Sequence, residues 1–284
     1  MGRFLLILLF PISLFGYSYK LAIGAQFKNE ARWLKEWIEY HRLIGVEHFY
    51  LYNNDSTDNY EEVLAPYVHA GIVDLIPWNS GSAPWIDPGS EDPYWVGFQL
   101  TAYNDCMKRA LGHACWVAII DIDEFIVPKH DATSLHRLLD KATRRVGTFS
   151  FLWRCFGTSE VWEVPMSSLL TETLVQRSDD DFASNQIVKS IHRPESIAYC
   201  KLHIAHPKRG YISIFIPPEQ VQINHYQLRG RKETLLKRCK IKIDEEIDIT
   251  PEILSTIKKY EDVYNRVEDK SIYIYLPILK NMIK

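Results

Sequence analysis

The segment Trp116–Phe125, WVAIIDIDEF, decides the fold. Its first five residues are apolar without interruption, which is typical of a strand buried on both faces of a parallel sheet. The apolar run stops at Asp121, and a second aspartate follows at Asp123. Residues i and i+2 of an extended chain point the same way, so both carboxylates can reach one hard cation such as Mg²⁺ or Mn²⁺. The alternative is a surface turn with two solvated acids, because a DxD triplet alone is common.

Strand and helix patterns alternate on the N-terminal side of this segment. The predicted strands are 21–27, 46–52, 72–78 and 116–120, and the predicted helices are 30–44, a helix ending near residue 69, and 97–111. This alternation predicts an α/β fold, mainly a parallel sheet with helices on both faces. Ligands of such sheets bind outside the carboxyl ends of the strands. The turns Asn53–Asp58 and Asp121–Glu124 lie at those ends, so we expect them beside one crevice.

The C-terminal half is less regular. Asn79–Tyr94 is rich in Gly, Pro, Ser and Asp and predicts a long loop, of a kind that is often functional. A helix over 135–142 and a strand over 148–153 precede a mixture of short strands and loops, and Pro251–Val267 predicts an amphipathic helix. We therefore expect one domain over residues 19–245, followed by a helical tail over residues 246–284.

The first 18 residues predict a targeting segment. Arg3 precedes the apolar run Phe4–Gly16 of about thirteen residues, which matches a signal-peptide core better than a membrane-spanning helix. Cleavage near Gly16 or Ser18 would export the protein, and an uncleaved segment would associate it with a membrane. A buried first strand is the third interpretation.

Composition narrows the class of protein. The 284 residues are 46% hydrophobic and 24% charged, which is ordinary for a globular protein, and the net charge of −3 gives no indication of nucleic-acid binding. The five cysteines include no CxxC pair, which argues against a zinc site. They are compatible with one or two disulfides in an exported protein or with buried free thiols.

A second chemistry also uses DxD after an apolar strand. In haloacid-dehalogenase-type phosphatases the first aspartate is a nucleophile, but Thr or Val normally stands two residues after the second aspartate and the motif lies near the chain start. Here that position is Phe125 and the motif is in mid-chain. The sequence therefore disfavours this class.

Several segments together resemble glycosyltransferase family 92, which is related to the family-2-like transferases. The matching segments are 28–30 (KNE), 33–41 (WLKEWIEYH), 45–58 (GVEHFYLYNNDSTD), 99–106 (QLTAYNDC), 116–125 (WVAIIDIDEF), 156–159 (FGTS), 189–191 (KSI), 193–194 (RP) and 224–226 (NHY). Their order and spacing over residues 20–240 are far more specific than the DxD triplet.

The resemblance implies a GT-A (Rossmann-like) fold, a UDP-sugar donor, Mn²⁺ or Mg²⁺, and inversion at the anomeric carbon. Galactose transfer to a glycan acceptor is the best-known activity of animal members. By resemblance, Asp121 and Asp123 are the DxD: Asp123 is expected to contact the metal, and Asp121 the ribose or the metal. His225 is expected to complete the metal site. A non-catalytic glycan-binding or scaffold protein that retains the fold is the alternative.

Further residues are expected at the nucleotide. Glu30 and Asp55 match loop positions near the base and ribose, and Gln99 and Asn104 are expected to face the same crevice. Arg229, in the basic stretch after His225, suits a diphosphate because a cation there stabilises the leaving group.

Three acidic residues are candidates for the catalytic base. Inverting transfer needs a base for the acceptor hydroxyl. Our candidate is Glu160, with Glu163 and Asp180 as further acids. Glu160 also departs from the family pattern, which has Gly after Thr158-Ser159.

Overall fold

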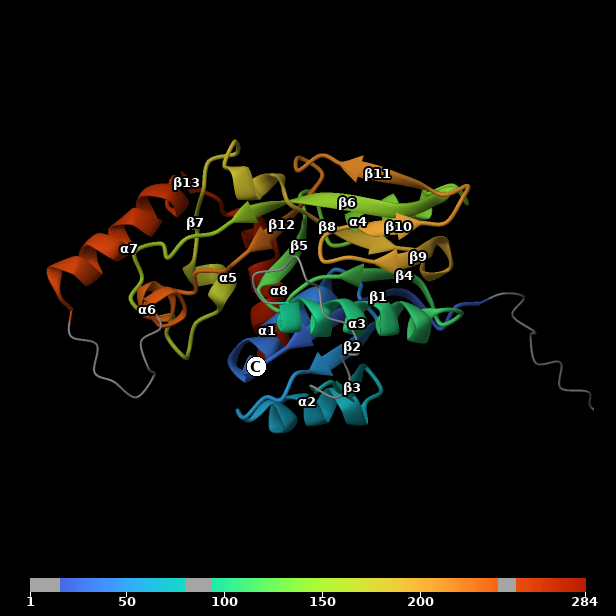
Figure 1. Cartoon of the computed structure of the whole chain (residues 1–284), viewed down its shortest axis with the longest axis horizontal. Coiled ribbons are helices and arrows are strands. Elements are labelled where there is room, and N and C mark those ends of the chain that lie inside the picture. The colour runs from blue at the N-terminus through green and yellow to red at the C-terminus, as the bar shows by residue number, and fades with distance from the viewer. Residues whose placement is uncertain (1–15, 80–92, 240–248) are drawn as a thin grey trace, which may run out of the picture.

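A mixed sheet organises the protein, and its strands follow the order β3-β2-β1-β4-β8-β6-β12-β5, with β11 beside β6 (Figure 1). The structure is a computed structural model that describes residues 16–79, 93–239 and 249–284. The strands of this sheet are β1 (Tyr19–Phe27), β2 (His48–Asn53), β3 (Val73–Pro77), β4 (Ala114–Ile119), β5 (Glu124–Pro128), β6 (Val146–Cys155), β8 (Val188–His192), β11 (Ile212–Ile216) and β12 (Val221–His225). Two small antiparallel pairs join β9 (Ile197–Cys200) to β10 (Ala205–Pro207) and β7 (Gln176–Arg177) to β13 (Val267–Glu268).

The sheet is mainly parallel, as the sequence predicts. β1 pairs in parallel with both β2 and β4, and β2 with β3. The departure lies beyond β4, where β8 is inserted antiparallel between β4 and β6. β12 then runs parallel to β6 and antiparallel to β5. The strand β5, which begins one residue after Asp123, was not predicted.

Helices cover both faces of the sheet. They are α1 (Ala31–Leu43), α2 (Tyr60–His69), α3 (Pro93–Ala110), α4 (Ser134–Asp140), α5 (Leu170–Thr173), α6 (Arg231–Cys239), α7 (Pro251–Tyr264) and α8 (Leu276–Ile283). α3 packs closely on β1, since a Cβ atom at Gly24 would lie 2.4 Å from Sγ of Cys106. The helices α1 and α2 pack together. α1 contributes Trp37, Ile38 and Tyr40 to the larger of two hydrophobic clusters, and α3 contributes to the smaller one.

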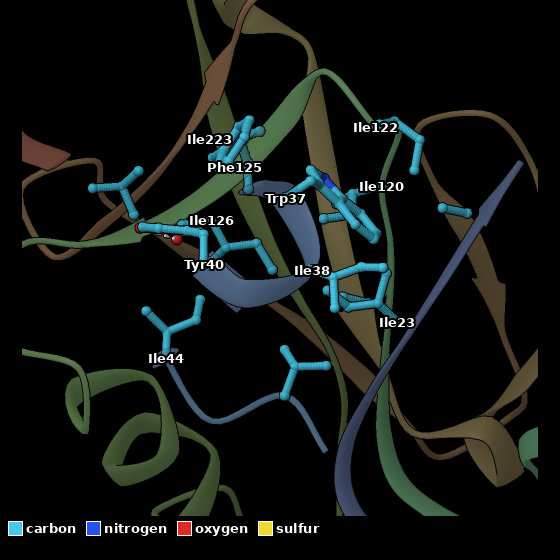
Figure 2. Packing of buried hydrophobic residues seen from close by; sticks show 14 of the residues in the cluster. Ile23, Trp37, Ile38, Tyr40, Ile44, Ile120, Ile122, Phe125, Ile126 and Ile223 are labelled. Atoms are coloured by element: carbon cyan, nitrogen blue, oxygen red, sulfur yellow. Dashed lines mark hydrogen bonds between the residues drawn. The ribbon is translucent and has the colours of Figure 1, made fainter. Parts of the chain in front are cut away.

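Helix α1 fixes the strand that follows the DxD. Figure 2 shows Trp37 and Tyr40 beside the β5 residues Phe125 and Ile126. Trp37 Nε1 donates to the Glu124 carbonyl at 2.8 Å, and the Tyr40 hydroxyl donates to the Ile126 carbonyl at 2.9 Å. His41 Nε2 accepts from the Ile126 N–H at 3.3 Å. Polar atoms of three core side chains thus form hydrogen bonds with the backbone N–H and C=O groups of β5.

The predicted tail is helical but belongs to the same core. α8 packs against α1, Leu279 is fully buried, and β13 pairs with β7. The Tyr275 hydroxyl donates to the Pro128 carbonyl at 2.5 Å, which connects the C-terminal segment to the end of β5. Residues 249–284 therefore complete the α/β unit.

Other predictions concern segments that the structure describes only in part. The apolar run of residues 4–16 and the predicted loop over 79–94 lie mostly outside the described residues. Within the described ranges, the helices are too short or too polar to cross a membrane. The four described thiols, at Cys106, Cys115, Cys155 and Cys200, are free. Three of these thiols are buried and Cys115 is partly exposed.

Candidate functional site

A cavity of about 290 Å³ opens where β1 and β4 end, next to the DxD turn. Its lining residues are Gln26, Phe27, Lys28, Glu30, Gln99, Asp121, Ile122, Asp123 and His225. They come from the end of β1, the start of α1, helix α3, the turn after β4 and the end of β12. The sheet topology alone brings these segments together, as expected at the carboxyl ends of parallel strands.

Asp121 is held by three side chains. Its Oδ1 accepts from Gln99 Nε2 at 2.9 Å and from the Tyr103 hydroxyl at 2.7 Å, and its Oδ2 accepts from Lys189 Nζ at 2.7 Å. Lys189 is only 2% exposed and also lies 3.4 Å from Glu124 Oε2. Asp121 is therefore a fixed hydrogen-bond acceptor whose Oδ2 can accept from one more donor.

Asp123 has a different environment. Its Oδ2 lies 3.6 Å from His225 Nε2 and 3.9 Å from Arg229 Nη2. The antiparallel pairing of β5 with β12 places His225 opposite Glu124, and Tyr226 N–H donates to the Asp123 carbonyl at 2.8 Å. Burial alone would lower the pKa of His225, but the charge of Asp123 reverses this and raises it to about 10.

Arg229 joins this group to the start of α1. It forms an ion pair with Glu30, and its guanidinium lies over the Trp33 ring at 5.3 Å from the centroid. Burial opposes its charge, yet Glu30 and Asp123 raise the pKa of Arg229. The guanidinium is therefore a permanent positive charge beside Asp123, where it suits an anionic group.

The residues of this cavity fit a divalent metal in part. A carboxylate and an imidazole, Asp123 and His225, lie close enough to share one ion, and this donor pair suits Mn²⁺. Across the described residues, however, no set of three His, Cys, Asp or Glu side chains is arranged to hold a metal. Asp121 is already engaged by Lys189, Gln99 and Tyr103, so the remaining ligands would have to come from a substrate and from water.

Unpaired buried polar atoms gather around the cavity. Among the described residues, the buried side-chain atoms without a hydrogen-bond partner include both amide atoms of Gln26, Glu124 Oε1, His225 Nδ1 and Arg229 Nε. Such atoms are rare in folded proteins and need a reason. Gln26 and His225 line the cavity, and Glu124 and Arg229 contact its residues Asp121 and Asp123, so unpaired polar atoms lie at and beside it.

Asn104 does not face the cavity. Its amide donates to the Cys200 carbonyl at 3.0 Å and accepts from the Cys200 N–H at 2.8 Å, so it anchors β9 to α3. The expectation that Asn104 and Gln99 share one crevice was wrong, because five residues turn a helix by about 500°, which leaves the two side chains about 140° apart. Asp55 also lies away from the cavity lining, exposed at φ 50° in the turn after β2.

The base candidates lie elsewhere too. Glu160, at φ 61°, lines a separate cavity of about 350 Å³ together with Arg231 and Glu261 of α7. Glu163 contacts Arg32 and Lys232, and Asp180 contacts Arg154 and Arg177. The described residues therefore do not place any of the three acids in the cavity of the DxD.

Four residues at or beside the site were not predicted: Gln26, Tyr103, Trp153 and Lys189. Trp153 packs on His225 with ring centroids 4.2 Å apart. The sequence contains the same indication for Gln26 and Lys189: each is a long polar side chain within a buried strand. Tyr103 lies one turn after Gln99, on the same face of α3, so periodicity could have identified it.

A turn carrying DxD at the carboxyl end of a central parallel strand, flanked by β1 and α3, is the arrangement of the GT-A class. The chain belongs to glycosyltransferase family 92, whose sequence profile matches residues 21–267.

Two relatives illustrate the similarity. A family 92 protein of Oryza sativa subsp. japonica is 28% identical over 214 residues, which cover 74% of this chain and 33% of the relative. A β-1,4-galactosyltransferase of Caenorhabditis elegans is 31% identical over 118 residues, 39% of this chain and 26% of the relative. The chain spans about a third of the length of the curated relatives that it matches first.

Solved structures show a weaker likeness. Staphylococcus aureus TarS is 10% identical with a TM-score of 0.42 and covers 85% of this chain and 43% of that one. Mycobacterium tuberculosis glucosyl-3-phosphoglycerate synthase, solved with Mn²⁺, UDP and glucosyl-3-phosphoglycerate, is 14% identical with a TM-score of 0.38, over 80% and 82% of the two chains. The family assignment rests on the sequence match.

Proposed function

We propose that the protein transfers a sugar from a UDP-sugar to a glycan acceptor in a metal-dependent reaction. The observation that carries the proposal is the division within the DxD. Asp121 is held by Lys189, Gln99 and Tyr103, while Asp123 faces His225 and Arg229. The Asp121 carboxylate is thereby oriented to accept a hydrogen bond from a ligand. The Asp123 carboxylate is placed to bind a cation that also contacts a diphosphate.

Each residue then has a role. Asp123 and His225 would hold Mn²⁺ or Mg²⁺, which supplies charge neutralisation for the diphosphate leaving group. Arg229 would contact a phosphate oxygen, since its charge is permanent and buried. The remaining lone pair of Asp121 Oδ2 would accept a hydrogen bond from a ribose hydroxyl.

Inversion and galactose as the donor sugar are part of the proposal. Membership of family 92 supports both, and the relative from C. elegans is named as a β-1,4-galactosyltransferase. The catalytic base stays unassigned, because Glu160 lines a different cavity. Inversion would be tested by NMR, which distinguishes the anomer formed at the earliest product signal.

A screen of nucleotide-sugar hydrolysis tests the activity. The purified protein would be incubated with UDP-galactose, UDP-glucose, UDP-N-acetylglucosamine and GDP-mannose, with Mn²⁺ or EDTA. We expect release of UDP with Mn²⁺ only, its loss in Asp123→Asn, and its retention in Asp181→Asn, an exposed matched control. Hydrolysis that persists in EDTA at the full rate would contradict the metal-dependent reaction.

The alternative is a non-catalytic glycan-binding protein. The acids among the described residues of the cavity lining are Glu30, Asp121 and Asp123, and each is already engaged by a basic side chain. The described lining therefore offers no further acid to act as the base, which favours this alternative. The screen separates the two functions, because a binding protein would retain UDP or a glycan without turnover.

Export or membrane association also remains a proposal, and it rests on the apolar run of residues 4–16. N-terminal sequencing of the protein from its native cells, with membrane fractionation, tests it. A mature N-terminus near Tyr17 or Tyr19, or a membrane-bound full chain, is expected, whereas an intact Met1 on a soluble cytoplasmic protein would contradict both forms.

A further inference from the structure

Gln26 is unusual for its strand. The other buried residues of β1, in the segment Leu21–Phe27, are apolar or glycine. Gln26 is 5% exposed, and neither Oε1 nor Nε2 has a hydrogen-bond partner among the described residues. A buried donor or acceptor without a partner has lost its hydration without compensation. An amide with both groups unpaired therefore requires an explanation, and a ligand provides one.

The position of Gln26 defines which part of a ligand it would meet. It lies in the wall of the DxD cavity, on the same face of β1 as Gly24, which packs against α3. α3 contributes Gln99 to the same wall, so the amides gather on this side. The charged pair Asp123 and His225 comes instead from the β5 and β12 side. The cavity thus has a part lined by Gln26 and by the Gln99 amide, which donates to Asp121, and a charged part around Asp123 and His225.

We propose that Gln26 hydrogen-bonds the edge of the donor's nucleobase. This inference rests on the proposed function, which makes that base uracil. A side-chain amide presents an acceptor beside a donor, and the uracil imide presents N3–H beside a carbonyl oxygen, so two parallel hydrogen bonds form. The diphosphate would occupy the charged part, at Asp123, and the ribose would lie between them, at Asp121.

The amide must turn to reach the base. Its atoms are covered by their neighbours, so a change of side-chain rotamer is required to present them to the cavity. Turning breaks no hydrogen bond, because the amide has none among the described residues. Binding therefore supplies Gln26 with partners that the protein does not, which favours the bound state.

The test combines a variant with a modified ligand. Gln26→Met keeps the length of the side chain and removes only its unpaired polar group, so folding should be retained. Calorimetry with Mn²⁺ present would compare UDP with N3-methyl-UDP, which lacks the imide N–H, and with inorganic pyrophosphate. Gln220→Met, an exposed glutamine, is the matched control.

The wild type should bind UDP about tenfold more tightly than N3-methyl-UDP, because about one good hydrogen bond is lost when N3 is methylated. In Gln26→Met this preference should disappear, UDP should bind about tenfold more weakly, and pyrophosphate binding should be unchanged. The disappearance of the preference isolates the contact in the manner of a double-mutant cycle.

Four outcomes would overturn the inference, and the last of them would also overturn the proposed function. If N3-methylation weakens binding equally in the wild type and in Gln26→Met, the amide does not contact the imide. If pyrophosphate and UDP weaken together, Gln26 acts on the phosphates. If UDP binding is unchanged, the amide holds only a buried water. If the wild type binds no nucleoside diphosphate at all, the proposed function itself fails and this inference falls with it.

Discussion

Replacing Lys189 by Met tests the arrangement that orients Asp121. Lys189 Nζ lies 2.7 Å from Asp121 Oδ2 and 3.4 Å from Glu124 Oε2, and among the described residues no other ammonium or guanidinium forms an ion pair with either carboxylate. Removing one partner of a buried ion pair costs about 3–5 kcal/mol, because the remaining charge stays buried. Burial already raises the pKa of Glu124 to about 7, so Glu124 can take up a proton instead. We therefore expect a loss near the lower end, about 3 kcal/mol.

The stability loss caused by Lys189→Met should depend on pH, and the pKa of Glu124 determines in which direction. A carboxyl whose folded pKa is raised above its unfolded value costs stability as the pH rises above the unfolded pKa. Loss of the ammonium raises the pKa of Glu124 further, so the penalty of Lys189→Met should grow from pH 5 to pH 8. Lys189→Met combined with Glu124→Gln removes this titration and should recover about 1–2 kcal/mol.

Urea unfolding followed by tryptophan fluorescence at pH 5, 6.5 and 8 measures these differences. Lys259→Met, an exposed lysine, is the control and should stay within about 0.5 kcal/mol of the wild type. A loss below about 1 kcal/mol, or a loss that is the same at pH 5 and pH 8, would refute the charge argument. The second result would leave only lost packing as the cause.

Four further variants address the metal, the phosphates and the buried histidine. Asp123→Asn should abolish Mn²⁺ binding in calorimetry, whereas Asp121→Asn should retain it and weaken UDP; equal loss of Mn²⁺ in both would contradict the division of the DxD. Arg229→Met should weaken UDP at least tenfold but leave uridine unchanged, which equilibrium dialysis would show. Burial lowers the pKa of His41 to about 3 although its ring bonds the Trp37 carbonyl, so His41 destabilises the fold by about 2 kcal/mol between pH 7 and 5. His41→Gln should flatten urea-unfolding stability over that interval by this amount, and an unchanged slope would refute the assignment.

The sequence predicts the N-terminal half of the fold well because its signals are local. The apolar run before Asp121 and the helical period of α1 each identify an element within its own segment, with ends that differ from the structure by one or two residues. The insertion of β8 between β4 and β6 has no such signal. It depends on pairing between Val117 and His192, which are far apart in the chain. Antiparallel pairing of this kind leaves only a short alternating pattern in each strand.

The site residues likewise fall into those that local sequence predicts and those that depend on long-range contacts. Asp121 and Asp123 could be found from one decapeptide, since the chemistry and the spacing lie together. The contact between Glu30 and Arg229 joins residues 199 positions apart. The resemblance to a family suggested that Glu30 lies near the nucleotide, and the basic stretch after His225 suggested the same for Arg229, but neither predicted the contact between them. Lys189 could not be assigned to Asp121 from sequence, because its role follows from the β8 insertion.

The DxD turn owes its rigidity to both halves of the chain. Three side chains of α1 form hydrogen bonds with the backbone of β5: Trp37, Tyr40 and His41. The N–H of Tyr226, the residue after β12, donates to the Asp123 carbonyl. A site that must place a metal and a diphosphate benefits when its ligands are fixed before binding. Glu30, the partner of Arg229, immediately precedes α1, so the same helix supports both the strand after the DxD and the cation beside it. A substitution in the core face of α1, such as Trp37→Phe, would therefore disturb UDP binding as well as stability, although Trp37 is fully buried and lies outside the cavity lining.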